Sequence, residues 1–127
     1  MPPTENALLL LRIVERHLRS LRFGLDEEFP AEDWGFTAQK ALEKLLKCWI
    51  VLGNQEPPRS HDLIELASLA EVDLSETLLA LQAFAVEARY RDGELPLPAR
   101  RKLILSSLNE LVRVFLDAAE CAKDQDR

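Results

Sequence analysis

The stretch that decides the fold is TAQKALEKLLKCWIVLGNQEPPRSHDLIELA, residues 37–67. It begins with a lysine-bearing amphipathic segment whose leucines recur at helical spacing. Gly53 then favours a helix end, and Pro57 and Pro58 prevent the helix from resuming. A His-Asp pair stands where the next helical pattern starts. The stretch therefore predicts two helices joined by a short turn, with two polar side chains at the start of the second helix.

Outward from this stretch, the same periodicity predicts three more helices. Apolar residues recur every three or four positions, and cationic residues occupy the opposite sides. Thr4 and Ser75 have side chains that cap helix N-termini, and Gly24 suits a helix end. We expect a frayed tail after about residue 122 and helices over residues 4–23, 31–52, 60 or 61 to 72, 76–88 and 99–122. In the second helix we expect Pro30 in the first turn, and the polar side carries Lys40, Lys44 and Lys47.

These helices indicate an all-α protein. Short connections between long amphipathic helices favour antiparallel neighbours, so we expect an up-and-down antiparallel bundle of about five helices. The chain has 127 residues, of which 47% are hydrophobic. That length and composition suit a single domain over residues 1–127 with a buried core.

Composition narrows the functional classes. No window approaches the ~18 apolar residues of a membrane span, and the N-terminal residues lack the basic start of a signal peptide, so we expect a cytoplasmic protein with no membrane association. Cys48 and Cys121 are far apart in the sequence and are expected to be reduced thiols, with no metal and no cofactor. The net charge of −6 argues against general wrapping around nucleic acid, but it permits a local basic site.

The first candidate site comprises Arg59, His61 and Asp62, where the third helix is expected to start. A helix N-terminus presents free backbone N–H groups and a positive potential, which disfavours an imidazolium. A neutral His61 would accept a proton or hydrogen-bond the edge of a base. The alternative is structural: Ser60 or Asp62 caps the helix, and His61 packs over the proline turn.

The second candidate site is a cluster of cations around one aromatic residue. Guanidinium groups make forked contacts with phosphate, and an aromatic ring stacks on a base. We therefore expect a nucleotide or RNA contact there, with a solvated loop as the alternative. The cluster comprises Arg89, Tyr90, Arg91, Arg100, Arg101 and Lys102.

A row of arginines on the first helix, with His17 beside it, has the pattern of an exposed polar face. The row comprises Arg12, Arg16 and Arg19. Phosphate-binding, dinucleotide-binding, zinc-protease and serine-hydrolase motifs are absent from the sequence.

Two separated segments resemble the HEPN-domain family. They are AQKALEKLLKCWIVLGNQEPPRSHDLIELA, residues 38–67, and AVEARYRDGELP, residues 85–96. In that family a lysine-bearing helix leads through a Pro-containing turn into a His-Asp-Leu helix start, and an Ala-Arg-Tyr segment closes the fourth helix. The resemblance covers roughly residues 34–117 and implies a small helical bundle that commonly forms homodimers.

The resemblance also implies a prokaryotic toxin–antitoxin pair in which the HEPN protein works with a minimal nucleotidyltransferase. Many members are metal-independent ribonucleases whose signature is an arginine followed, after four to six residues, by a histidine. Here no histidine follows Arg89. Arg12 and His17 match in spacing, but a helix separates them by about 140°, so they could not readily share one phosphate. The catalytic residues therefore cannot be carried over from the family.

Three functions are compatible with these residues. We favour a HEPN protein of a toxin–antitoxin pair that binds nucleotide or RNA and a nucleotidyltransferase partner, with His61, Asp62, Arg89 and Tyr90 as binding or structural residues. The alternative is a metal-independent endoribonuclease with a divergent site that includes His61. A helical adaptor without a nucleic-acid role is the third, and the cation cluster argues against it.

Overall fold

The computed structural model describes residues 2–86 and 95–125. All regular structure within these residues is helical, as the apolar periodicity predicts. The elements are the α-helices α1 (Pro3–Phe23), α2 (Ala31–Leu52), α3 (Leu63–Ala70), α4 (Glu76–Leu79), α5 (Ala83–Val86) and α6 (Arg101–Gln125), with a 3₁₀ turn η1 (Ala80–Gln82) between α4 and α5.

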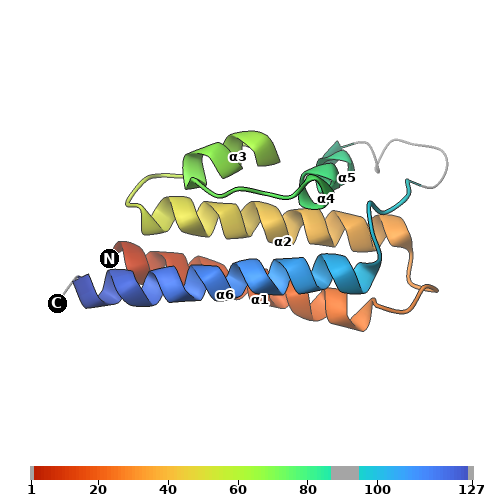
Figure 1. The fold of residues 1–127 in the computed structure, drawn as a ribbon, viewed down its shortest axis with the longest axis horizontal. Helices are drawn as coiled ribbons and strands as arrows, with labels where there is room; N and C mark the ends of the chain where they lie inside the picture. Colours follow the sequence, from red (N-terminus) through yellow and green to blue (C-terminus); the bar gives the residue numbers. More distant parts are fainter. Residues whose placement is uncertain (1, 87–94, 126–127) are drawn as a thin grey trace.

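Three long helices, α1, α2 and α6, form the body of the molecule, and the short helices α3, α4 and α5 lie over α2 (Figure 1). α1 and α2 are antiparallel, and α6 returns alongside them, so the two ends of the described chain lie at the same end of the bundle. α2 is the central element, because it contacts α1, α3, η1, α5 and α6. The predicted all-α antiparallel bundle is thus confirmed.

The core surrounds α2 and contains several aromatic side chains. The fully buried Trp34 anchors the start of α2, and its indole Nε1 donates a hydrogen bond to the Leu21 carbonyl at the end of α1 (3.0 Å). Further along α2, Trp49 meets Phe115 of α6 edge to face, with ring centroids 5.1 Å apart. Such pairs add about 0.5–1.5 kcal/mol to the burial of the rings themselves. These contacts hold the three long helices together.

Gly35 allows α5 to approach α2 very closely. A Cβ atom built at Gly35 would lie 2.4 Å from ring carbons of Phe84, which is buried in the core. No real Cβ contact is that short, so only glycine fits at this position unless Phe84 moves. The close packing of α5 on α2 therefore requires a glycine at this position.

The second helix has the predicted bounds, but several other helix ends differ. α1 starts at Pro3 with Pro2 at the cap position, and Thr4 is buried instead of capping. Pro at the first helical position is favourable because it has no N–H to leave unpaired. Pro30 precedes α2 at its cap position and does not lie in the first turn. α6 spans Arg101–Gln125, so it starts two residues later and ends three residues later than expected.

The third expected helix is shorter than predicted and the fourth is divided, while the expected end of the fourth at residue 88 lies outside the described residues. α3 starts at Leu63 because Asp62 caps it, and it ends at Ala70 because Glu71 adopts a left-handed conformation (φ 57°). Ser75 caps α4 as predicted, with its hydroxyl accepting from the Leu78 N–H (3.2 Å). The continuous helix expected after Ser75 is instead divided by η1. No glycine or proline marks this division, so the sequence pattern does not reveal it.

Two further sequence expectations concern thiols and membranes. Cys48 is a buried free thiol whose pKa burial raises to about 12, so it stays protonated and unreactive at neutral pH. Cys121 is free and exposed. None of the helices in the described ranges combines the length and the apolar character needed to cross a membrane.

Candidate functional site

A charged row runs along one face of α2, and it is more buried than its sequence suggests. The row comprises Lys40, Glu43, Lys44 and Lys47. Glu43 and Lys44 each lie three or four residues from Lys40 and from Lys47, so all four share one side of the helix. The sequence pattern places the three lysines on the polar side of this helix, yet Lys47 is only 9% exposed and Glu43 is completely buried. A polar position does not imply exposure here, because α2 contacts both α1 and α3. We call these four residues the α2 charged row.

Glu43 is the centre of the row. Its carboxylate contacts the Nζ atoms of Lys40 and Lys47, each at 3.4 Å, and the Nδ1 atom of His61. Burial alone raises the pKa of Glu43, but the hydrogen bond with His61 and the two lysine charges outweigh burial and hold this pKa below its ordinary value. Glu43 is therefore an ionised carboxylate in the interior of the protein, compensated by its neighbours.

The contact with Glu43 fixes the role of each ring nitrogen of His61. A carboxylate only accepts hydrogen bonds, so Nδ1 carries the proton in the neutral ring, and Nε2 is left as an acceptor. The His61 side chain is 63% exposed, whereas Glu43 is buried beneath it. Because carboxylate orientation of one nitrogen leaves the other free to bind or exchange a proton, the pair has the geometry of a general acid–base group.

The second histidine of the chain lies on the other side of the same row. His17 projects from α1, and its pKa is lowered by burial and by the charges of Arg16, Lys44 and Lys40. It therefore favours the neutral form near neutral pH. Together the two histidines flank a row with three lysines and one carboxylate, so this part of an acidic protein carries local positive charge.

The residues beside His61 are structural in this conformation. The Asp62 carboxylate caps α3 by accepting from the backbone N–H groups of Ile64 (2.9 Å) and Glu65 (3.4 Å). The Ser60 hydroxyl accepts from the Asp62 N–H (3.1 Å). The alternative that Asp62 caps the helix is thus confirmed. The packing of His61 over the proline turn stays a prediction, and the structure adds a polar partner for His61, the Glu43 carboxylate. Arg59 is exposed.

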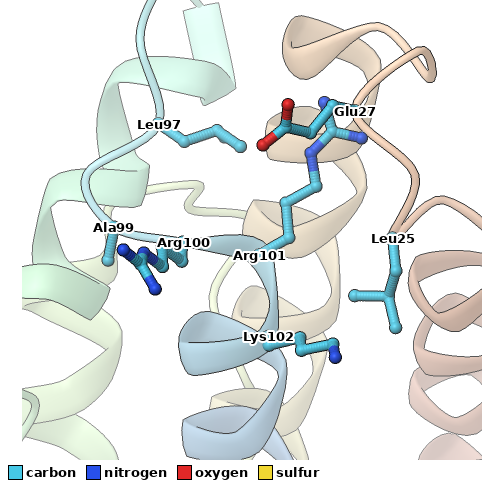
Figure 2. Close-up of a pocket in the computed structure, with 7 residues that line it drawn as sticks. All are labelled: Leu25, Glu27, Leu97, Ala99, Arg100, Arg101 and Lys102. Carbon is cyan, nitrogen blue, oxygen red and sulfur yellow. The ribbon is translucent and has the colours of Figure 1, made fainter.

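A hollow of about 590 Å³ lies where α6 begins (Figure 2). The α6 side of this hollow carries three consecutive cations, Arg100, Arg101 and Lys102, and the turn after α1 contributes Leu25 and Glu27. Arg100 and Lys102 are exposed. In Figure 2 the three side chains extend in different directions and do not converge on one point.

Arg101 has a structural role at this hollow. Its guanidinium donates to the backbone carbonyls of Gly24 (2.7 Å), Asp26 (2.7 Å) and Phe29 (2.6 Å). These three carbonyls belong to the turn between α1 and α2, so Arg101 ties the start of α6 to that turn. Such contacts also explain how a cation is accommodated in the first turn of a helix, where the dipole disfavours positive charge. Its predicted ligand contact stays a prediction.

Three residues of the second candidate cluster, Arg89, Tyr90 and Arg91, lie outside the described residues. The structure therefore brings together Arg100, Arg101 and Lys102 alone from that cluster. His61 belongs to a different surface, beside the α2 charged row. Among the residues with described positions, no group of three or more His, Cys, Asp or Glu side chains is arranged to hold a metal ion.

Comparison with models of known protein families identifies the family of this chain. The model of the HEPN domain matches residues 7–122. The chain belongs to the HEPN family. The match includes all six described α-helices except the first residues of α1 and the last residues of α6. No curated protein and no solved structure matches the chain.

HEPN domains commonly dimerise. In this HEPN chain the only Arg-to-His pair with the ribonuclease spacing is the pair on α1. Arg12 is exposed and lines a surface hollow with Arg16 and Arg19, whereas His17 is half-buried beside the lysines of α2. The two side chains thus have different surroundings.

The residue that sequence reasoning missed is Glu43. In a sequence, a single glutamate among lysines on a helix is typical of an exposed, solvated charge. The available signal was its spacing: Glu43 lies three residues after Lys40 and four before Lys47, so all three share one side of the helix. The sequence does not show that the segment before α3 closes over that side and places His61 on the carboxylate.

Proposed function

We propose that this HEPN protein binds the phosphate groups of a nucleotide or an RNA strand at the α2 charged row, with His61 at the edge of the ligand. The observation that carries the proposal is the buried Glu43 carboxylate joined to an exposed histidine within a row of lysines. Lysines supply positive charge, and the oriented imidazole supplies a hydrogen-bonding group beside it.

The charge balance of the row supports an anionic ligand. Three lysines and one ionised glutamate give the row a net charge of about +2 with both histidines neutral, in a protein whose overall charge is −6. Lys44 is half-buried and has no hydrogen bond or ion pair within residues 2–86 and 95–125. Its charge is therefore the one in the row that no ion pair compensates, and it is free to pair with a phosphate. The cations at the start of α6 would be a second contact for a longer strand.

In this proposal the protein is the HEPN member of a cytoplasmic toxin–antitoxin pair and works with a minimal nucleotidyltransferase. Family membership supports this context, and the absence of a correctly placed Arg-to-His pair favours a binding role over the usual ribonuclease role. A minimal nucleotidyltransferase encoded by the adjacent gene, together with co-purification of the two proteins, would support the assignment. A neighbour of another class and no complex would count against it.

A titration with a fluorescent single-stranded RNA and with ATP tests the binding site. We expect binding that weakens as salt rises, and Lys44→Ala should reduce the slope of log K against log salt by about 0.7 for RNA. Lys123→Ala, which removes an exposed lysine from the other end of α6, is the matched control and should leave the slope unchanged. Equal effects of the two variants, or no binding by the wild type at low salt, would refute the site.

The Glu43–His61 pair also favours a second function, a metal-independent endoribonuclease. With Nδ1 bonded to Glu43, Nε2 of His61 could take the proton of a ribose 2′-hydroxyl as its oxygen attacks the adjacent phosphorus. The bond between that phosphorus and the 5′-oxygen of the next nucleotide would break, and the departing oxygen would take a proton from water. The lysines would stabilise the charge that develops on the phosphate. Cleavage of RNA in the presence of EDTA, abolished by His61→Ala and retained by Arg113→Ala on α6, is the expected result. Intact RNA after incubation with wild-type protein would exclude this function.

A further inference from the structure

One segment of the chain carries acidic residues without any lysine or arginine. From residue 60 to residue 86 the chain contains no basic residue other than His61. This segment forms the linker before α3, then α3, α4, η1 and α5, which lie over α2 (Figure 1). Its acidic residues are Asp62, Glu65, Glu71, Asp73 and Glu76.

An apolar groove lies within this acidic segment. A hollow of about 450 Å³ is lined by Ile64, Val72, Leu74 and Leu79 and is bordered by the carboxylate-bearing residues Glu71 and Asp73. Ile64 is 67% exposed, and Leu69 on the same short helix is 44% exposed. Two exposed aliphatic side chains on a helix of eight residues lower the solubility of the protein. Exposed apolar patches with a polar rim are typical of interaction surfaces.

The groove is preformed by the way α3 ends. The Val72 N–H donates to the Ala67 carbonyl (3.0 Å), and the Glu71 N–H donates to the Ser68 carbonyl (3.2 Å). This is the Schellman arrangement, in which the residue after the helix usually is glycine because it adopts a left-handed conformation. Here Glu71 occupies that position. The turn thus fixes a carboxylate-bearing side chain beside the apolar floor.

The buried face of α3 leaves the groove side unpartnered. Leu63 and Leu66 are completely buried in the core, whereas Ile64 projects from the other side of the helix. Within the described part of the chain, Figure 1 shows no element on the outer side of α3. An acidic border repels nucleic-acid phosphates and anionic lipid headgroups and attracts cations. The apolar floor of the groove and its acidic border together favour a ligand that is both apolar and basic.

We propose that the groove between α3 and α4 docks a basic amphipathic segment of another protein. Apolar side chains of that segment occupy the hollow beside Ile64, and its lysines or arginines lie against Glu71 and Asp73. This surface is separate from the α2 charged row, because Ile64 faces away from α2. Docking here leaves the proposed phosphate-binding site accessible.

A synthetic helical peptide tests the apolar part of the proposal. The probe has leucines along one face and lysines flanking them, and the comparison peptide has glutamates in place of the lysines. We expect fluorescence anisotropy to show binding of the lysine peptide alone, weakened about tenfold or more by Ile64→Ser. Leu116→Ser on α6 removes another exposed leucine (43%) and should leave affinity unchanged. Equal losses in both variants, or no binding of the lysine peptide, would overturn the proposal.

A charge exchange tests the acidic border. Glu71→Lys combined with Asp73→Lys should transfer preference from the lysine peptide to the glutamate peptide. Glu120→Lys combined with Asp124→Lys makes the same change in net charge on α6 and should retain the preference of the wild type. A uniform response of the two double variants would show that net charge alone governs binding, which contradicts a docking site.

The groove has one competing occupant, a second copy of this chain. Light scattering of Ile64→Ser distinguishes the two cases. The proposal expects the same oligomeric state as the wild type. Conversion from dimer to monomer by Ile64→Ser would assign the groove to self-association and overturn the docking proposal.

Discussion

Glu43 is a buried carboxylate with several partners that depend on it. Lys47 is 9% exposed, so removing the carboxylate would leave a lysine charge in a poorly solvated position. Replacing one member of a buried charged pair typically costs about 3–5 kcal/mol. We expect Glu43→Gln to lower the free energy of unfolding by about 3 kcal/mol in a urea titration at neutral pH. A change below about 1 kcal/mol would show that the row is not a stabilising network.

The pH dependence of Glu43 has a defined sign. Its pKa in the folded protein is below the ordinary value of 4.5. The stability that comes from this shift is fully present above pH 4.5 and is lost as the pH falls through the folded-state pKa. The stability of wild-type protein should therefore decline more steeply below pH 4.5 than that of Glu43→Gln, as measured by urea denaturation at a series of pH values. Parallel curves would contradict this assignment.

His17 affects the stability of the protein over a different pH range. Its pKa in the folded protein is lowered from 6.5, so the unfolded chain binds a proton first as the pH falls. Stability should consequently decline from about pH 7 downwards until the folded-state pKa is reached. His17→Gln should show a shallower decline over pH 7 to 5 in thermal unfolding. His61 is present in both proteins, so the difference between the two curves reports His17 alone. An identical slope in the variant would contradict this prediction.

At the residue scale, sequence reasoning located part of the site. It singled out His61 and Asp62 because they stand at a helix start, and the structure places both there. It did not connect His61 with Glu43, because the two lie 18 residues apart and only the turn between α2 and α3 brings them together. A contact of this kind depends on tertiary packing, which periodicity does not encode.

Among the elements, the contact of α2 with α5 is the most restrictive. A helical Gly→Ala change ordinarily stabilises by up to about 1 kcal/mol, because alanine has the higher helix propensity. At Gly35 the added methyl group would overlap the Phe84 ring. We therefore expect Gly35→Ala to destabilise the protein by about 1–3 kcal/mol in chemical denaturation. Gly35→Ala combined with Phe84→Leu should recover part of the loss, and a stabilising Gly35→Ala would show that α5 is loosely packed.

The start of α6 depends on Arg101 in a comparable way. Three backbone carbonyls of the preceding turn accept from its guanidinium. Arg101→Ala should lower the free energy of unfolding by about 2 kcal/mol, because hydrogen bonds to charged donors contribute more than neutral ones. Arg101→Lys should not restore it, since a single ammonium group does not reproduce the planar fork. Arg100→Ala is the neighbouring control, and a matching loss of stability in that variant would contradict a specific role for Arg101.

The accuracy of the expected helix bounds varied with the type of signal. α2 was bounded correctly, because an acidic proline turn precedes it and Gly53 and two prolines follow it. The division of the fourth helix was missed. η1 carries Gln82, whose side-chain oxygen accepts from the Leu63 N–H (2.7 Å), so this turn serves α3 and not only its own segment. Long-range contacts of this kind override local helix propensity.

On the scale of the whole molecule, the all-α bundle followed from amphipathic periodicity and short connections. The unequal sizes of the helices did not follow, and three long helices carry most of the structure. The oligomeric state is a prediction. α6 exposes Leu103 and Val114, which lie 11 positions apart and hence on the same side of the helix. We expect a homodimer through this side, as is common for HEPN domains.

Light scattering, which measures the mass of the protein in solution, tests the predicted dimer. Wild-type protein at tens of micromolar should have twice the mass of one chain, and Leu103→Glu combined with Val114→Glu should shift it to the monomer, because a charged side chain is costly at an apolar interface. The double change Asn109→Glu and Leu116→Glu, at exposed positions on another side of α6, adds the same two side chains and should keep the dimer. A monomeric wild type would contradict the prediction.

The position of α6 has a consequence for synthesis of the chain. Phe115, Ile104 and Leu108 complete the core against α1 and α2, yet the ribosome adds them long after both of those helices. Until they leave the ribosome, the nascent protein has an uncovered apolar strip that chaperones would recognise. Messages truncated before α6 should therefore yield polypeptides that aggregate or are degraded, and the bundle should close only after α6 has been translated.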